Sequence, residues 1–272
     1  MRASFRPYDR TMDSETDPIP WVRALRASHD RLAGIAGPLD ADGLRKRSYA
    51  KEWSVAQVLS HLGSQAEIFS LWLDAALTGG DPPGQEAFGP IWDVWNARSP
   101  EEQASRSVKA NGNLIARIEA LSEAELASIR LAMFGRSLDA AGLLRMRLSE
   151  HAVHSWDVAV TFDPAARVAP DAVGLLIDGL SPMMGWMGKK AADPALIAVT
   201  ATGPARSYTL DTGGVTLTPG PADDAASATL ELTAEALLRL VYGRVDESAL
   251  ASGEVRVSGV TLAGLQAVFP GF

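Results

Sequence analysis

A short stretch near the middle of the chain, residues 147–156 (RLSEHAVHSW), carries Glu150, His151 and His154, although the whole sequence has only four histidines. On a helix, Glu150 and His154 lie about 40° apart around the axis and about one turn apart in height. Their carboxylate and imidazole can therefore converge on one point, as two ligands of a metal ion do. His151 points about 100° away from Glu150. Zinc-like ions need a third protein ligand and keep a further position for water or substrate.

One histidine far upstream fits as the third ligand. His61 lies three residues after Val58 and one before Leu62, at the border of an apolar stripe that should face the interior of a helical bundle. Bundles build metal sites from side chains that project inward from facing helices. Antiparallel packing would bring His61 to Glu150 and His154, so these three side chains form a candidate metal site.

Simpler interpretations of the same residues stay open. A histidine beside an apolar stripe is often a hydrogen-bonded core residue, and Glu and His four positions apart often form a surface pair. His29, the remaining histidine, is followed by two charged residues and is expected to be solvated. The residues alone therefore indicate a metal site without excluding a structural role.

Composition limits the possible partners. The chain has 272 residues and 47% hydrophobic content, enough for one large domain or two modest ones. The net charge of −8 and the lack of a basic patch argue against binding nucleic acid. No apolar run approaches the roughly 18–20 residues of a membrane helix, so no membrane partner is expected. The first residues lack the apolar segment of a secretory signal, which predicts a polar tail in a cytoplasmic protein.

The sequence contains no cysteine. Disulfides, cysteine-ligated zinc and a cysteine nucleophile are therefore excluded. A metal must be held by His, Asp or Glu, and any thiol chemistry requires a thiol cosubstrate.

The first two thirds of the chain have the apolar period of long helices. Ser54 and Gln57 form a capping-box pattern at the start of one helix, and Pro100 is suited to the first position of another. Ser181-Pro182 is expected to interrupt the last helix of this part. The predicted helices span residues 19–37, 54–77, 100–121, 138–160 and 171–192.

The last third is different in character. Short segments rich in β-branched residues and bounded by Gly, Pro and Asp predict strands, with one helix over residues 234–243. The predicted strands span residues 196–202, 206–211, 214–220, 227–233 and 255–259. The fold class is therefore α plus α+β, with Asp193-Pro194 as the junction. The predicted organisation is a polar tail (1–18), a helical bundle (19–192) and a smaller α+β domain (193–272).

Two segments resemble a known family. WSVAQVLSHLGSQAEIF (53–69) resembles the W-S/T-x-x-x-V/L-x-x-H-L/V opening of the DinB/YfiT-like bundle superfamily. RLSEHAVHSWDVAV (147–160) resembles the E-x-x-x-H-x-W-D signature of one branch, the mycothiol-dependent maleylpyruvate isomerase family of actinobacteria. The resemblance implies an N-terminal DinB-like four-helix metal-binding bundle and a C-terminal α+β domain related to sterol-carrier folds.

The resemblance also implies roles for individual residues. It implies a divalent metal, zinc in the best-known members, held by His61, Glu150 and His154, with mycothiol as the thiol cosubstrate. Trp156 and Asp157 match the trailing W-D of the signature. We expect Trp156 to pack in the core. Asp157 is expected to orient His154 or Arg147, because metal-bound imidazoles usually donate their other N–H to an acceptor, although a simple helix-end charge is the alternative.

In the family's isomerase, an arginine of the C-terminal domain holds the substrate carboxylates. The candidates here are Arg244, Arg239 and Arg256, and Arg244 just after a helix end is the preferred one. A surface arginine paired with Asp246 or Glu247 is the competing interpretation of Arg244.

These observations lead to one expected function and two alternatives. The first is a metal-dependent thiol enzyme, a mycothiol-dependent isomerase or S-transferase, acting on a small electrophile such as maleylpyruvate. A coordinating thiol loses its proton in the field of a metal, and the thiolate is the reactive nucleophile. The alternatives are a metal-dependent hydrolase and a non-catalytic binding protein with a pocket lined by the methionines of residues 182–187. The sequence is compatible with a monomer or a homodimer.

Overall fold

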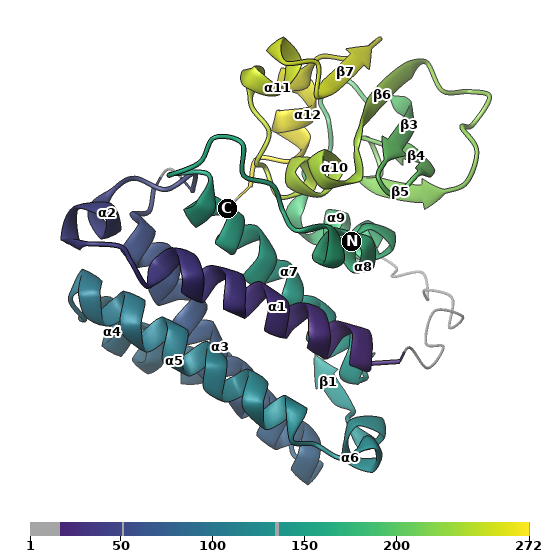
Figure 1. The fold of residues 1–272 in the computed structure, drawn as a ribbon. Helices are drawn as coiled ribbons and strands as arrows, with labels where there is room; N and C mark the ends of the chain where they lie inside the picture. The colour runs from purple at the N-terminus through teal and green to yellow at the C-terminus, as the bar shows by residue number, and fades with distance from the viewer. Residues whose placement is uncertain (1–16, 51, 134–135, 272) are drawn as a thin grey trace.

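The computed structural model describes residues 17–50, 52–133 and 136–271. Most of the predicted polar tail, residues 1–18, therefore lies outside the described residues. Four long helices pack side by side as a bundle in the N-terminal part (Figure 1): α1 (Ile19–Ala36), α3 (Val55–Thr78), α5 (Pro100–Glu119) and α7 (Ala140–Ala159). This arrangement confirms the predicted four-helix bundle.

Local capping explains where two of these helices begin. At α3, Ser54 Oγ accepts a hydrogen bond from the Gln57 N–H, and Gln57 Oε1 accepts one from the Ser54 N–H over 2.8 Å. Ser99 and Glu102 form the same reciprocal pair before α5, where Pro100 takes the first helical position. Each pair satisfies backbone N–H groups that have no partner inside the helix. The starts of α3 and α5 are therefore encoded locally.

The bundle also contains short elements that the sequence did not predict. They are α2 (Ala41–Arg45), the 3₁₀ helix η2 (Gln85–Ala87), α4 (Phe88–Asn96), α6 (Glu123–Ser128), and a hairpin of β1 (Leu131–Met133) and β2 (Arg136–Leu138). α4 packs directly on α3, because Gly63 leaves room for Trp95: a Cβ at Gly63 would lie 2.1 Å from the Trp95 ring. Such contacts depend on packing between helices, which leaves no periodic signal in a short segment.

The predicted helix over residues 171–192 is divided differently from the expectation. It consists of α8 (Pro170–Leu176), a 3₁₀ turn (Ile177–Gly179) and α9 (Leu180–Met187). The break precedes Ser181-Pro182 instead of falling on it. Pro182 lies in the first turn of α9, where a missing backbone N–H costs the helix no internal hydrogen bond.

The C-terminal part contains a five-stranded sheet, as expected for an α+β domain. Its strands are β3 (Leu196–Thr202), β4 (Arg206–Asp211), β5 (Thr216–Pro219), β6 (Ala228–Thr233) and β7 (Val255–Ser258). The order is β5-β4-β3-β6-β7, with β3 and β6 parallel and the other neighbours antiparallel. Three helices accompany it: α10 (Ala234–Val241), α11 (Glu247–Ala251) and α12 (Leu262–Val268). The five predicted strands and the predicted helix are therefore present, whereas α11 and α12 were not predicted.

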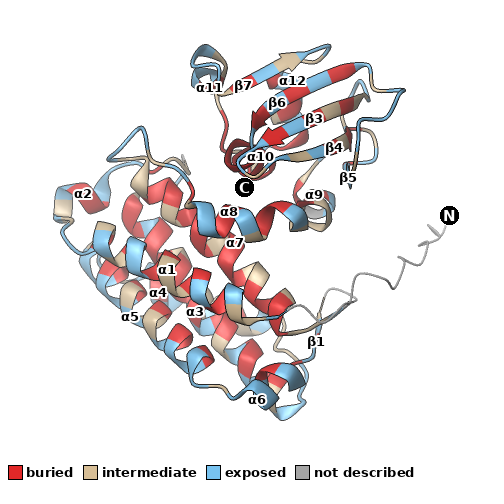
Figure 2. Ribbon diagram, turned by 45° about the vertical axis from the view of Figure 1, so that its right-hand side comes forward, coloured by how far each residue is buried: buried red, intermediate tan, exposed pale blue. Residues whose placement is uncertain are grey.

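Burial follows the periodicity of each element. In β6, alternate residues are buried, and in the bundle the buried residues lie on the faces that the helices turn toward one another (Figure 2). Within the described part of the chain, no helix is both long and apolar enough to cross a bilayer. The division of the chain at Asp193-Pro194 stays a prediction.

Two polar contacts, one half-buried and one buried, join the two parts near the end of α7. The hydroxyl of Tyr49 donates to Asp246 over 3.1 Å, and the backbone N–H of Val168 donates to the buried Glu235 over 3.0 Å. Buried polar groups require such partners, so these contacts favour one relative placement of the two parts. These contacts between the two parts lie beside the end of α7, the helix that carries Glu150 and His154.

Candidate metal centre

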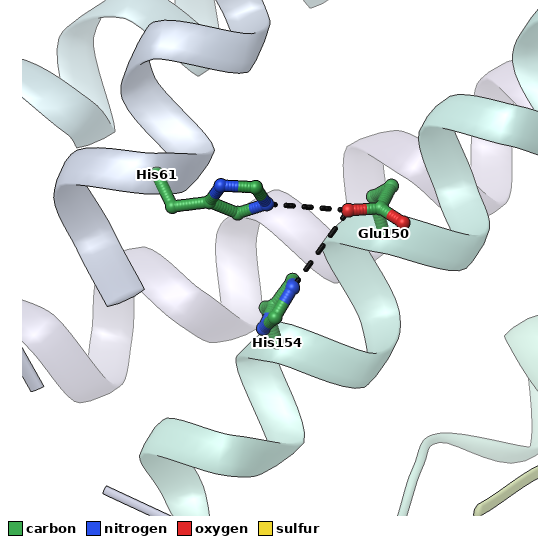
Figure 3. A group of neighbouring side chains, drawn as sticks. All are labelled: His61, Glu150 and His154. Atoms are coloured by element: carbon green, nitrogen blue, oxygen red, sulfur yellow. Dashed lines mark hydrogen bonds and ion pairs between the residues drawn. The ribbon is translucent and has the colours of Figure 1, made fainter. Parts of the chain in front are cut away.

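The structure brings the three predicted metal ligands together. His61 projects from α3, and Glu150 and His154 project from α7 toward it (Figure 3). His61 Nε2 lies 3.2 Å from Glu150 Oε2, and His154 Nε2 lies 3.7 Å from the same oxygen. One ligand atom from each residue lies within 4.8 Å of the other two. The side chains of His61 and Glu150 are each 24% exposed, so solvent or a ligand can reach the cluster.

Helix geometry explains this convergence. His61 lies between the fully buried Val58 and Leu62 on the apolar face of α3, so its ring is directed into the bundle. Glu150 and His154 are one turn apart on α7 and share a face. Trp53, just before α3, packs its ring 4.9 Å from that of His61 and 5.9 Å from that of His154. The Trp53 indole therefore limits the positions that the two imidazoles can take.

The donor set fits a divalent cation. His154 Nδ1 lies 2.9 Å from Asp157 Oδ2, and an ionised carboxylate only accepts hydrogen bonds. The proton of the neutral imidazole is therefore on Nδ1, and the lone pair of Nε2 faces His61 and Glu150. Two imidazole nitrogens and one carboxylate are a ligand set that zinc accepts, with a position left open.

The protonation states suit this role as well. Burial alone would raise the pKa of Glu150, but its hydrogen bond with His61 and the nearby imidazole charges lower that pKa to about 2. Burial lowers the pKa of His61 below its usual value. At neutral pH the site therefore has one carboxylate charge and a neutral His61.

Asp157 links His154 to the C-terminal part of the chain. Its side chain is fully buried and forms a bidentate ion pair with Arg244. Arg244 Nε lies 3.2 Å from Asp157 Oδ1, and Arg244 Nη2 lies 3.1 Å from Asp157 Oδ2. Burial raises the pKa of Asp157, but the hydrogen bond with His154 and the charge of Arg244 outweigh this effect and lower it. Asp157 therefore stays ionised beside His154, as the orienting role requires. Its second partner is Arg244, not the predicted alternative Arg147.

The three candidate arginines have different environments. Arg244 is only 4% exposed, so its interpretation as a surface arginine is wrong. Arg239 is also buried and pairs with Glu235 and Glu254, with the guanidinium 5.0 Å from the Trp156 ring centre. Arg256 is exposed on β7. Of the three, Arg244 alone is bound to the carboxylate that holds His154.

Trp156 packs in the core as expected. It is 3% exposed, and its indole N–H donates to the carbonyl of Ala166 over 2.9 Å. A buried indole N–H normally finds an acceptor in this way. Trp156 is therefore a packing residue at the junction between the two parts of the chain.

Sequence reasoning missed Gln65 beside the candidate ligands, and with it the contact between Gln65 and Arg147. Gln65 lies one turn after His61 on α3, and its Nε2 donates to Glu150 Oε2 over 2.9 Å. Arg147 is 1% exposed and donates from Nη1 to Gln65 Oε1 over 3.0 Å. The four-residue spacing from His61 to Gln65 was visible in the sequence, since residues at this spacing share a helix face.

The expectation that His29 is solvated was wrong. His29 is 6% exposed, and its ring centre lies 6.2 Å from that of the fully buried His151. It follows Leu25 by four residues and precedes Leu32 by three, so it belongs to the buried face of α1. The two charged residues after His29 point elsewhere around the helix and gave a misleading signal.

Comparison with known proteins agrees with this architecture. Residues 25–159 match the family model described as mycothiol maleylpyruvate isomerase N-terminal domain. An uncharacterized protein of Mycobacterium tuberculosis, found in two strains, is 29% identical over 232 residues, which cover 78% of this chain and 81% of the relative. A crystal structure of the mycothiol-dependent maleylpyruvate isomerase superposes with a TM-score of 0.66 and 14% identity, covering 90% of this chain and 95% of that one. At this low identity, the superposition shows a shared fold and nothing further. Residues 25–159 are therefore similar in sequence to the mycothiol maleylpyruvate isomerase N-terminal domain family.

Proposed function

We propose that this protein is a metal-dependent enzyme that uses a low-molecular-weight thiol, mycothiol, to transform a small electrophile. The observation that carries the proposal is the convergence of His61 Nε2, Glu150 Oε2 and His154 Nε2 on one partly exposed point. The match of residues 25–159 to the mycothiol maleylpyruvate isomerase N-terminal domain model supports the choice of thiol. Zinc is the proposed metal because it accepts this ligand set.

The chain's own residues define what the site can do. When bound, the metal would supply a positive field that lowers the pKa of a coordinating thiol. Glu150 contributes one negative charge and the imidazoles of His61 and His154 contribute none, so a divalent ion would keep a net positive charge. Because the sequence has no cysteine, the reacting sulfur must come from the cosubstrate.

The proposed chemistry is addition of the thiolate to an activated double bond. A new C–S bond forms while the C=C π pair moves toward the conjugated carbonyl. Rotation about the resulting single bond and expulsion of the thiolate return the trans isomer, with no net oxidation. If the sulfur instead stays attached and the carbon takes up a proton, the outcome is S-transfer. Both reactions need the same site, and maleylpyruvate-like cis-enoyl diacids are the proposed substrate class for isomerisation.

We propose supporting roles for Asp157 and Arg244. Asp157 holds the Nδ1–H of His154, so it positions this imidazole. Arg244 is bound to both oxygens of Asp157 and is buried. A role for Arg244 in holding a substrate carboxylate would require it to leave Asp157, so the geometry favours positioning over direct substrate contact.

The experiment that tests the proposal is an assay of the purified protein with Zn²⁺, mycothiol and a set of cis-enoyl diacids and other electrophiles. We expect turnover that requires both metal and thiol, that is lost in His154→Ala, and that persists in His29→Gln, a histidine substitution away from the site. Turnover without thiol would instead indicate hydrolysis. Thiol-dependent turnover that is unchanged in His154→Ala would overturn the proposal.

A further inference from the structure

Gln65 presents its amide to the candidate metal centre from α3. The amide nitrogen lies 2.9 Å from Glu150 Oε2 and 3.0 Å from His61 Nε2. Two of the three proposed ligand atoms therefore lie within hydrogen-bonding distance of one primary amide. A primary amide nitrogen carries two N–H donors.

Arg147 determines which end of this amide faces the site. Its guanidinium is a donor without acceptor capacity, and its Nη1 lies 3.0 Å from Gln65 Oε1. Arg147 also donates to the carbonyl of Leu62 over 3.1 Å and to the side-chain oxygen of Asn111. Burial lowers the pKa of Arg147 only to about 10, so it stays cationic at neutral pH. Rotation of the Gln65 amide by half a turn would place its N–H₂ against this buried cation, which disfavours that orientation.

Metal binding changes the partners of the two N–H groups unequally. Glu150 Oε2 has further lone pairs, so it can accept from Gln65 and also bind a cation. His61 Nε2 has a single acceptor position, and a bound cation would occupy it. The Gln65 N–H that faces His61 Nε2 would then have no acceptor there, and a half-buried donor without a partner costs free energy.

We propose that this second N–H of Gln65 donates to the anionic atom, sulfur or oxygen, that occupies the open position of the metal centre. Gln65 is then a ligand-contacting residue, and Arg147 is the positioning residue that keeps its N–H₂ directed at the site. The inference rests on the metal centre of the proposed function and adds a group that selects anions for it. A hydrogen bond to a charged group is worth about 1.5–3 kcal/mol, which corresponds to roughly ten- to a hundredfold in anion affinity.

The test measures anion binding without turnover. The full-length protein is loaded with Co²⁺ to saturation, and azide is titrated while the visible Co²⁺ spectrum is recorded. We compare wild type with Gln65→Leu, which removes the amide, and with Gln65→Glu, which keeps an acceptor for Arg147 but removes both N–H donors. Gln57→Glu is the matched control, because it makes the same substitution at an exposed position of the same helix.

We expect azide to bind at least tenfold more weakly to Gln65→Leu than to wild type, and more weakly still to Gln65→Glu, whose negative charge repels the anion. Gln57→Glu should bind azide as wild type does. Arg147→Lys should show an intermediate loss, because a lysine cannot hold all three acceptors and the Gln65 amide becomes free to rotate. Circular dichroism tests whether each variant is folded. If Gln65→Leu does not fold, the azide affinity of Gln65→Glu tests the inference by itself.

Unchanged azide affinity in both Gln65 variants at saturating Co²⁺ would overturn the inference, even if metal affinity falls. Unchanged affinity in Arg147→Lys would overturn the positioning part. These outcomes are independent of thiol chemistry. If wild type binds Co²⁺ and azide in a Gln65-dependent way but shows no thiol-dependent turnover, the proposed function fails while the inference about Gln65 stands.

Discussion

The four histidines form two pairs, and α7 contributes one histidine to each pair. His61 and His154 meet between α3 and α7 with Glu150 beside them, and the side chains of His61 and Glu150 are partly exposed. His29 and His151 meet between α1 and α7 and are buried, with Ser28 Oγ 2.8 Å from His151 Nδ1. The first pair has a carboxylate, an acceptor that fixes one tautomer, and access from outside. These three features distinguish a candidate ligand from a packing histidine of the same helix.

The largest expected difference between the two pairs is in metal affinity. His154→Ala and Glu150→Gln should each lower Zn²⁺ affinity by more than about a hundredfold, because removal of a ligand costs more than the 10–100-fold loss seen when a supporting residue is changed. Isothermal titration calorimetry of the metal-free protein measures this. His29→Gln should bind Zn²⁺ like wild type, and an equal loss in this variant would remove the distinction between the pairs.

The next largest effect concerns Asp157, the carboxylate that holds the Nδ1–H of His154. Asp157→Asn should lower Zn²⁺ affinity about 10–100-fold, because His154 loses a charged acceptor on Nδ1. It should also lower the free energy of unfolding by about 3 kcal/mol or more, because Arg244 is left buried without its counter-charge. Calorimetric titration and urea unfolding measure the two effects. Metal affinity equal to that of wild type would show that Asp157 only binds Arg244 and does not support the metal ligand His154.

The buried pair should be visible in the pH dependence of stability. Burial lowers the pKa of His29 and of His151, so below about pH 6.5 the unfolded chain binds protons that the folded chain does not. Stability is therefore highest above this pH and falls as the pH decreases toward the folded-state pKa values, by up to about 1.4 kcal/mol per pH unit for each histidine.

Urea unfolding of the protein with a chelator present, between pH 7.5 and 5, measures this slope. Burial also lowers the pKa of His61, so the metal-free cluster adds to the wild-type slope. His29→Gln should reduce the slope by the share of one histidine. If the slope stays the same in His29→Gln, folding does not lower the pKa of His29.

The smallest effect separates hydrogen bonding from metal binding. Ser28→Ala removes a hydrogen-bond partner of His151 Nδ1, and Ser155 Oγ, 3.3 Å away, remains as a second partner. We expect a loss of about 1 kcal/mol in the free energy of unfolding and unchanged Zn²⁺ affinity. Thermal unfolding and calorimetric titration test both expectations, and a metal-affinity loss would connect the buried pair to the metal centre.

Much of the candidate site followed from local sequence. The four-residue spacing of Glu150 and His154 places them on one helix face, and the apolar neighbours of His61 direct it inward. Gln65 was missed although it lies one turn from His61, because an amide has no distinctive pattern until its partners are known. The partners of Asp157 were partly predicted. Its contact with His154 spans three residues and was expected, whereas its contact with Arg244 spans 87 residues.

The sequence by itself determined the long helices, the strands and the three convergent ligand candidates, because helical period, strand alternation and capping act over a few residues. The tertiary structure decided the pairing of Arg147 with Gln65 and of Arg244 with Asp157, and the short elements α2, α4 and α6. These features depend on which faces pack together across long separations in the chain. Contacts of this kind are properties of the assembled core, so no local pattern encodes them.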